Sequence, residues 1–139
     1  MILAQEKVLE IIPHRPPFVM VDELLAASEE EIISGFTIQE DNLLNEEGSF
    51  SFPGLIENIA QTCAAGFGYL DQQSGGEPKV GFIGAISKLA TFERPKIGLK
   101  IETKVQVIQK LYNVVLIKGA SYLGTEKLIE CEMKIVIAE

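Results

Sequence analysis

The chain has 139 residues, and 47% of them are apolar while 23% are charged, a balance that excludes a disordered chain and suits one domain over residues 1–139. The formal net charge of −8 disfavours a nucleic-acid partner, because phosphate backbones repel an acidic surface. No apolar stretch is long enough to span a membrane, and the N-terminal segment lacks the basic region of a secretory signal. We therefore expect a cytoplasmic protein without a membrane partner.

Histidine and cysteine are scarce in this sequence. His14 is the single histidine, and Cys63 and Cys131 are the only cysteines. Two isolated cysteines form no disulfide framework, and together with one histidine they do not make an ordinary zinc site. We therefore expect a reduced protein that holds no metal and needs no cofactor.

The first third of the chain is predicted to contain a short helix and two strands. Apolar residues in segment 4–12 suit a short helix that ends at Pro13. Residues 13–17 include three prolines and cannot form regular structure. Segments 18–25 and 31–38 have the pattern of strands, and residues 41–51 form a polar loop that contains glycine.

A long helix is predicted over residues 52–70. Its apolar positions follow the spacing of one helical stripe, with Ser51 as N-cap and Pro53 in the first turn. Glycines within a helix lower its stability, by about 1 kcal/mol each relative to alanine. We interpret Gly66 and Gly68 as positions where other backbone comes close, which predicts a buried helix.

The second half of the chain has the two-residue period of strands. Segment 80–92 is a long apolar run with two glycines, which suits a central strand with bends. Three further strands are predicted at 100–107, 113–122 and 128–137, joined by short connections typical of antiparallel hairpins. The result is an α+β fold of one long central helix and a curved antiparallel sheet of about six strands. Open sheet edges favour a homodimer with two-fold symmetry.

Three segments carry a family resemblance. Residues 9–22, LEIIPHRPPFVMVD, resemble the L-L-P-H-R-x-P-F-L-L-V-D segment of the 3-hydroxyacyl-(acyl-carrier-protein) dehydratases. Residues 55–62, LIENIAQT, resemble their helix segment L-I-L-E-A-M-A-Q, and residues 84–95, GAISKLATFERP, resemble A-G-I-D-E-A-R-F-K-R-P. Their order and approximate spacing agree over nearly the whole chain. The resemblance implies the hot-dog fold, a long helix wrapped by an antiparallel sheet.

The chain departs from this family at one important place. The family carries its catalytic histidine in a G-H-F-P-G segment before the helix, whereas residues 45–54, NEEGSFSFPG, contain no histidine. In this respect the chain resembles the divergent dehydratase-like branch associated with aryl-polyene and related acyl-carrier pathways. The resemblance implies a substrate held as a thioester of acyl-carrier protein or coenzyme A, and a catalytic carboxylate at Glu57.

Dehydration of a 3-hydroxyacyl thioester needs a base for the α-proton and an acid for the departing hydroxyl group. A neutral imidazole suits the first task and a carboxyl group in apolar surroundings suits the second. We therefore expect His14 as base and Glu57 as acid. Free N–H groups at the helix N-terminus, near Gly54 and Leu55, are candidates to stabilise the enolate oxygen, and Gln61 could orient Glu57 from one turn away.

The wider set of candidate contacts follows family position. The residues expected to contact the substrate are Phe18, Pro53, Gly54, Leu55, Gln61 and Gly84. The basic residues that could meet an acidic carrier protein are Arg15, Lys88, Arg94 and Lys96.

Other interpretations of the same residues stay open at this point. Glu57 could be a solvated helix residue stabilised by the helix dipole, and His14 could simply order a proline-rich turn. The chain could accordingly be an acyl-binding or partner subunit of an active hot-dog dehydratase, with catalysis lost. It could also be a hot-dog thioesterase that uses Glu57 and water.

Overall fold

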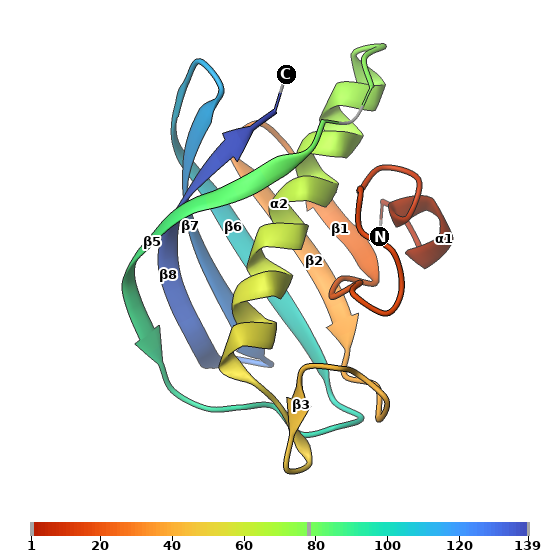
Figure 1. The fold of residues 1–139 in the computed structure, drawn as a ribbon, viewed down its shortest axis with the longest axis vertical. Helices are drawn as coiled ribbons and strands as arrows, with labels where there is room; N and C mark the ends of the chain where they lie inside the picture. The colour runs from red at the N-terminus through yellow and green to blue at the C-terminus, as the bar shows by residue number, and fades with distance from the viewer. Residues whose placement is uncertain (1, 78, 139) are drawn as a thin grey trace.

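The computed structural model describes residues 2–77 and 79–138, which form one long helix wrapped by an antiparallel sheet (Figure 1). The six sheet strands lie in the order β1-β2-β6-β7-β8-β5. Their bounds are Glu23–Ala27 for β1, Glu31–Thr37 for β2, Lys100–Leu111 for β6, Val114–Leu123 for β7, Glu126–Ile137 for β8 and Gly81–Thr91 for β5. This arrangement confirms the predicted α+β architecture.

The central helix α2 covers Phe52–Gln73 and fills the concave face of the sheet (Figure 1). Ser51 caps it, because the Ser51 side chain accepts a hydrogen bond from the Gly54 N–H at 3.1 Å. Leu55 and Ile59 are fully buried, and such side chains each stabilise the fold by roughly 1.5–3 kcal/mol. The helix ends three residues later than the sequence predicted.

Two glycines of α2 lie where neighbouring chain segments touch the helix. A Cβ atom at Gly66 would overlap the Ile32 side chain of β2, and one at Gly68 would overlap the Ile11 carbonyl oxygen. Only glycine fits at this separation, which explains why the helix tolerates residues of low helix propensity. The predicted buried helix is confirmed, and other backbone comes close at Gly68 as expected, whereas at Gly66 the close neighbour is a side chain.

The N-terminal segment differs from the prediction in two places. Helix α1 covers only Gln5–Val8, and β1 begins at Glu23 rather than at residue 18. Residues 18–22 form no strand. The Met20 backbone is bonded by the side chains of Asn58 and Gln61 of α2, and not by the backbone of a neighbouring strand. We call this apolar segment, residues 18–22, the strap, because it lies across the helix.

Strand β5 is an edge strand, so the prediction of a central strand was wrong. Among the described strands it pairs only with β8. Its Phe82 and Leu89 side chains, and that of Phe92 directly after it, are about half exposed. The apolar run was interpreted as burial inside the sheet, whereas in this chain it forms an uncovered apolar edge. The expected bends are present, because the pairing with β8 shifts register around Gly84 and again before Ala90.

The predicted loop before α2 contains a small hairpin of β3 (Asn45–Glu46) and β4 (Ser49–Phe50). Its turn is made by Glu47 and Gly48, both with positive φ. The hairpin directs the chain into α2, and it occupies the region where the resembled family has its histidine loop. Within the described part of the chain, neither helix is long and apolar enough to cross a membrane.

Candidate active site

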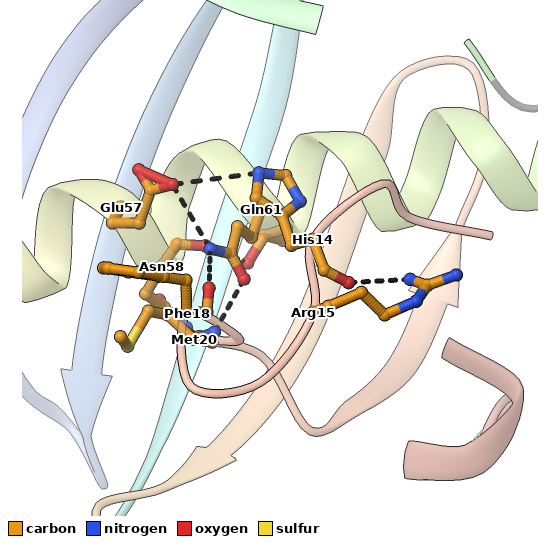
Figure 2. Close-up of polar contacts among 8 residues, drawn as sticks. His14, Arg15, Phe18, Met20, Glu57, Asn58 and Gln61 are labelled. Atoms are coloured by element: carbon orange, nitrogen blue, oxygen red, sulfur yellow. Dashed lines mark hydrogen bonds and ion pairs between the residues drawn. The ribbon is translucent and has the colours of Figure 1, made fainter. Parts of the chain in front are cut away.

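His14 lies in the proline-rich loop between α1 and β1, which passes beside α2 (Figure 2). The prolines restrict the loop backbone, and the Arg15 guanidinium donates to the carbonyl oxygens of Ile12 at 2.9 Å and of His14 itself at 2.7 Å. These bonds fold the loop back on itself. The His14 side chain is thereby held against the helix.

Glu57 lies in the second turn of α2 and faces His14 (Figure 2). The distance from His14 Nε2 to Glu57 Oε1 is 3.8 Å, and the two side chains are 26% and 34% exposed. This separation is longer than a hydrogen bond, and it lets both groups reach neighbouring atoms of one small reacting unit. The structure therefore brings together the imidazole and the carboxyl group that the sequence singled out.

The surroundings of His14 favour its neutral form. Burial lowers the pKa of His14, the nearby Glu57 carboxylate offsets part of that lowering, and Arg15 adds slightly to it. Among the residues that the structure describes, none hydrogen-bonds the buried Nδ1 atom of His14. A neutral imidazole retains one unprotonated nitrogen, which is what a general base requires.

Gln61 connects the helix, the strap and Glu57 (Figure 2). Its amide nitrogen donates to the Phe18 carbonyl oxygen at 2.8 Å and to Glu57 Oε1 at 3.2 Å, while its oxygen accepts from the Met20 N–H at 2.6 Å. Gln61 is completely buried. The expected orienting contact between Gln61 and Glu57 is thus present in the structure, within a wider set of bonds.

Asn58 ties the same strap to the sheet. It donates to the Met20 carbonyl oxygen at 2.6 Å and accepts from the Thr103 hydroxyl of β6 at 2.5 Å, and Thr103 in turn bonds Ser121 of β7 at 2.8 Å. All of these side chains are buried. Buried and fully bonded polar groups of this kind fix one arrangement of helix, strap and sheet. The loop that carries His14 therefore cannot shift freely along the helix.

A cavity of about 320 Å³ extends from the His14–Glu57 pair. The α2 residues on its wall follow each other at intervals of three or four, so they share one helix face. These helix residues are Glu57, Ala60, Ala64, Phe67 and Asp71. The start of β5, with Gly81, and the end of β8, with Ile135 and Ile137, complete the wall. The cavity is therefore a mainly apolar trough with His14 and Glu57 near one end.

Most of the predicted substrate contacts lie elsewhere. Phe18, Pro53, Gly54, Leu55 and Gly84 are not part of the cavity wall, and Gln61 contacts Glu57 from behind it. The N–H of Gly54 donates to the Ser51 side chain and that of Leu55 donates to the Ser51 carbonyl oxygen at 3.1 Å. The expectation of free N–H groups at the helix start is therefore not met in this chain.

Sequence reasoning missed the trough itself. Ala60, Ala64 and Phe67 were assigned only to the apolar stripe of the helix. The signal that could have found them is their spacing from Glu57, since residues three, seven and ten positions after it must share its face. Small alanines next to a carboxylate on one face leave room that larger side chains would fill.

The basic residues suggested for carrier contact are largely engaged within the chain. Arg94 donates to the backbone carbonyls of Phe50 and Ser49, both at 3.2 Å, and to that of Glu46. Lys88 pairs with Glu132 at 3.2 Å. Arg94 therefore fastens the β3–β4 hairpin to the segment after β5. In the described part of the chain, no three His, Cys, Asp or Glu side chains come together as a metal site would need.

A long helix wrapped by an antiparallel sheet defines the hot-dog fold. The family model for ApeP-like proteins, described as ApeP dehydratase, matches residues 6–135, and the chain belongs to this family.

Individual relatives agree with this assignment. The chain is 29% identical over 139 residues to the 3-hydroxyacyl-(acyl-carrier-protein) dehydratase FabZ of Oceanobacillus iheyensis, with 96% of each chain covered. It is also 29% identical to the FabZ dehydratase of Wolinella succinogenes, over 96% of this chain and 95% of the relative. The dehydratase heterocomplex ApeI:P from Xenorhabdus doucetiae has the same fold, with a TM-score of 0.87, 14% identity, and coverage of 95% of this chain and 91% of the other.

Proposed function

We propose that this protein dehydrates 3-hydroxyacyl thioesters carried by acyl-carrier protein or coenzyme A, with His14 as base and Glu57 as acid. The observation that carries the proposal is the position of the two groups, 3.8 Å apart beside an apolar trough. Membership of a dehydratase family supports the reaction type. The trough supplies a place for an acyl chain, since it is lined mainly by alanine, phenylalanine and isoleucine side chains.

In the proposed reaction, His14 removes a proton from C2 of the substrate, where the thioester carbonyl makes it acidic. The electron pair of the broken C–H bond forms the C2–C3 double bond as the C3–O bond breaks. Glu57, in its protonated form, gives its proton to the departing hydroxyl group, which leaves as water. The products are a 2-enoyl thioester and one water molecule.

The short distance between the two groups also accounts for recovery after each cycle. Loss of water leaves an imidazolium beside a carboxylate, and a proton that returns from His14 to Glu57 restores the starting state. At 3.8 Å this return needs only a small movement or one bridging water. The lowered pKa of His14 favours the release of that proton.

We further propose that two copies of the chain pair along β5. This edge strand has 11 residues and presents exposed apolar side chains, among them Phe82, Ile86 and Leu89. An uncovered apolar strand edge is a template for pairing, and a two-fold pair of edges removes it from water. Because the start of β5 also lines the trough, the second copy would lie beside the substrate.

The test is a turnover assay with 3-hydroxyacyl thioesters of several lengths, on acyl-carrier protein and on coenzyme A. The expected product is the 2-enoyl thioester, identified by mass and ultraviolet absorbance. His14→Ala and Glu57→Gln should each lower kcat by about 10²–10⁴-fold, the usual contribution of a general acid or base. Glu126→Gln, an exposed carboxylate in β8, is the matched control and should retain full turnover.

Each alternative gives a different result. Free acid and free thiol as products would identify a thioesterase and contradict the dehydratase proposal. A wild-type chain without turnover on either carrier, at any length, would contradict catalysis by this chain alone and favour a partner subunit. Full turnover by His14→Ala would show that the base is another group. Light scattering of the purified chain tests the proposed pair, and a monomer would contradict it.

A further inference from the structure

A second cavity adjoins the far end of the trough. It has a volume of about 470 Å³ and lies around the C-terminal turns of α2 and the β6–β7 hairpin. It shares four wall residues with the trough, namely Phe67, Asp71, Lys79 and Ile137. Its other walls include charged and polar residues, among them Glu29, Ser74 and Lys110. An apolar trough thus meets a polar cavity at a shared wall.

Phe67 is the large apolar residue that α2 contributes to this shared wall. On the same helix face, the two preceding positions that line the trough are Ala60 and Ala64, which leave it open. Asp71 follows Phe67 after one helical turn and brings a charge. A long acyl chain therefore meets two obstacles at this wall. The first is the bulk of the Phe67 side chain, and the second is the free-energy cost of burying the Asp71 carboxylate against methylene groups.

On the basis of the proposed function, we infer that Phe67 sets the maximum length of the acyl chain that this site accepts. The ten residues from Glu57 to Phe67 advance about 15 Å along the helix. An extended hydrocarbon advances about 1.25 Å per carbon, from bond lengths of about 1.5 Å and angles of about 111°. The trough therefore accommodates roughly ten to twelve carbons beyond the reacting carbon before the chain meets Phe67.

The inference predicts how affinity depends on acyl length, here called the binding profile. Affinity should rise with each added carbon up to one length, the break, and no further. Each methylene buried in the trough strengthens binding about fourfold, and this gain should stop at the length that reaches Phe67. Phe67→Ala opens the wall as far as Asp71, four residues or about 6 Å further, which adds roughly four to five carbons before the break. Ala64→Leu closes the trough one turn earlier and should shorten the profile by roughly three to four carbons.

The experiment measures dissociation constants by calorimetry for saturated acyl thioesters of N-acetylcysteamine, from four to eighteen carbons, below their critical micelle concentrations. These compounds lack the 3-hydroxyl group, so binding is measured without dehydration. Leu70→Ala is the matched control, because Leu70 lines only the second cavity and its truncation should leave the wild-type profile unchanged. Thermal unfolding monitored by circular dichroism checks that each variant is folded.

Opposite shifts in Phe67→Ala and Ala64→Leu would support the inference, since damage to the fold weakens binding at all lengths and does not lengthen the profile. If Phe67→Ala does not fold, Ala64→Leu alone decides, and an unchanged break overturns the inference. Unshifted profiles in a protein that still produces enoyl thioesters would overturn the role of Phe67 and leave the proposed function intact. Absence of binding at every length would overturn the inference, while the turnover assay judges the function separately.

Discussion

Replacing Gln61 by methionine tests whether the strap that leads from His14 is held by the helix. Methionine has nearly the volume of glutamine, so no cavity forms, but it makes none of the three hydrogen bonds. The Met20 N–H is left unpaired in a buried position, at a cost of about 1–3 kcal/mol. The Phe18 carbonyl belongs to a residue that is 58% exposed, so water replaces that bond and the net loss is about 1 kcal/mol.

The expected loss is therefore about 2–4 kcal/mol of unfolding free energy, a large part of the 5–15 kcal/mol typical of a domain. Urea denaturation measures it as a lower midpoint at unchanged slope. Turnover should also fall, chiefly in kcat, because Gln61 positions Glu57 without contacting the reacting carbons. Gln72→Met, at an exposed position of the same helix, is the matched control. A loss no larger than that of the control would refute the anchoring role.

Three further predictions follow from single groups. Because burial lowers the pKa of His14, we expect its NMR titration midpoint below 6.5 and a lower pKa still in Glu57→Gln. Activity should fall as the pH drops through that midpoint, because His14 then loses its free nitrogen; a midpoint above 6.5 would contradict this. Gly68→Ala should destabilise the fold by about 1–3 kcal/mol in thermal unfolding, because its Cβ meets the Ile11 carbonyl, and a stabilised variant would show that the segment at Ile11 can move. Arg94→Lys should speed amide hydrogen exchange at Phe50, because the single nitrogen of lysine cannot take both positions, Nε and Nη2, from which the guanidinium bonds the three carbonyls; unchanged protection would contradict the fastening role.

The architecture could be predicted because each element has a local signature. The helical stripe from Phe52 and the alternation over residues 100–107 and 128–137 reflect one buried face each, and the structure confirms all three as elements. Close approach at Gly66 and Gly68 was also predictable, since glycine inside a helix costs stability that only packing offsets.

The edge position of β5 could not be predicted from its own residues. A strand buried inside a sheet and a strand buried between subunits both require apolar side chains, so the composition of segment 80–92 does not distinguish them. Likewise, the strap at residues 18–22 has the apolar pattern of a strand. At Met20 its hydrogen-bond partners are the side chains of Asn58 and Gln61, more than 35 positions away, and no local pattern reports them.

Under the proposed function, the position of His14 accounts for a base in a chain without the histidine loop of the resembled family. A general base must be held near its acid by parts of the fold that do not move relative to each other. Here Asn58 and Gln61, three positions apart on one helix face, both bind the backbone at Met20, and Gln61 also contacts Glu57. The same helix face therefore fixes the acid directly and the base through the strap. Under this arrangement the β3–β4 hairpin only needs to lead the chain into α2, so it is free to lack a histidine.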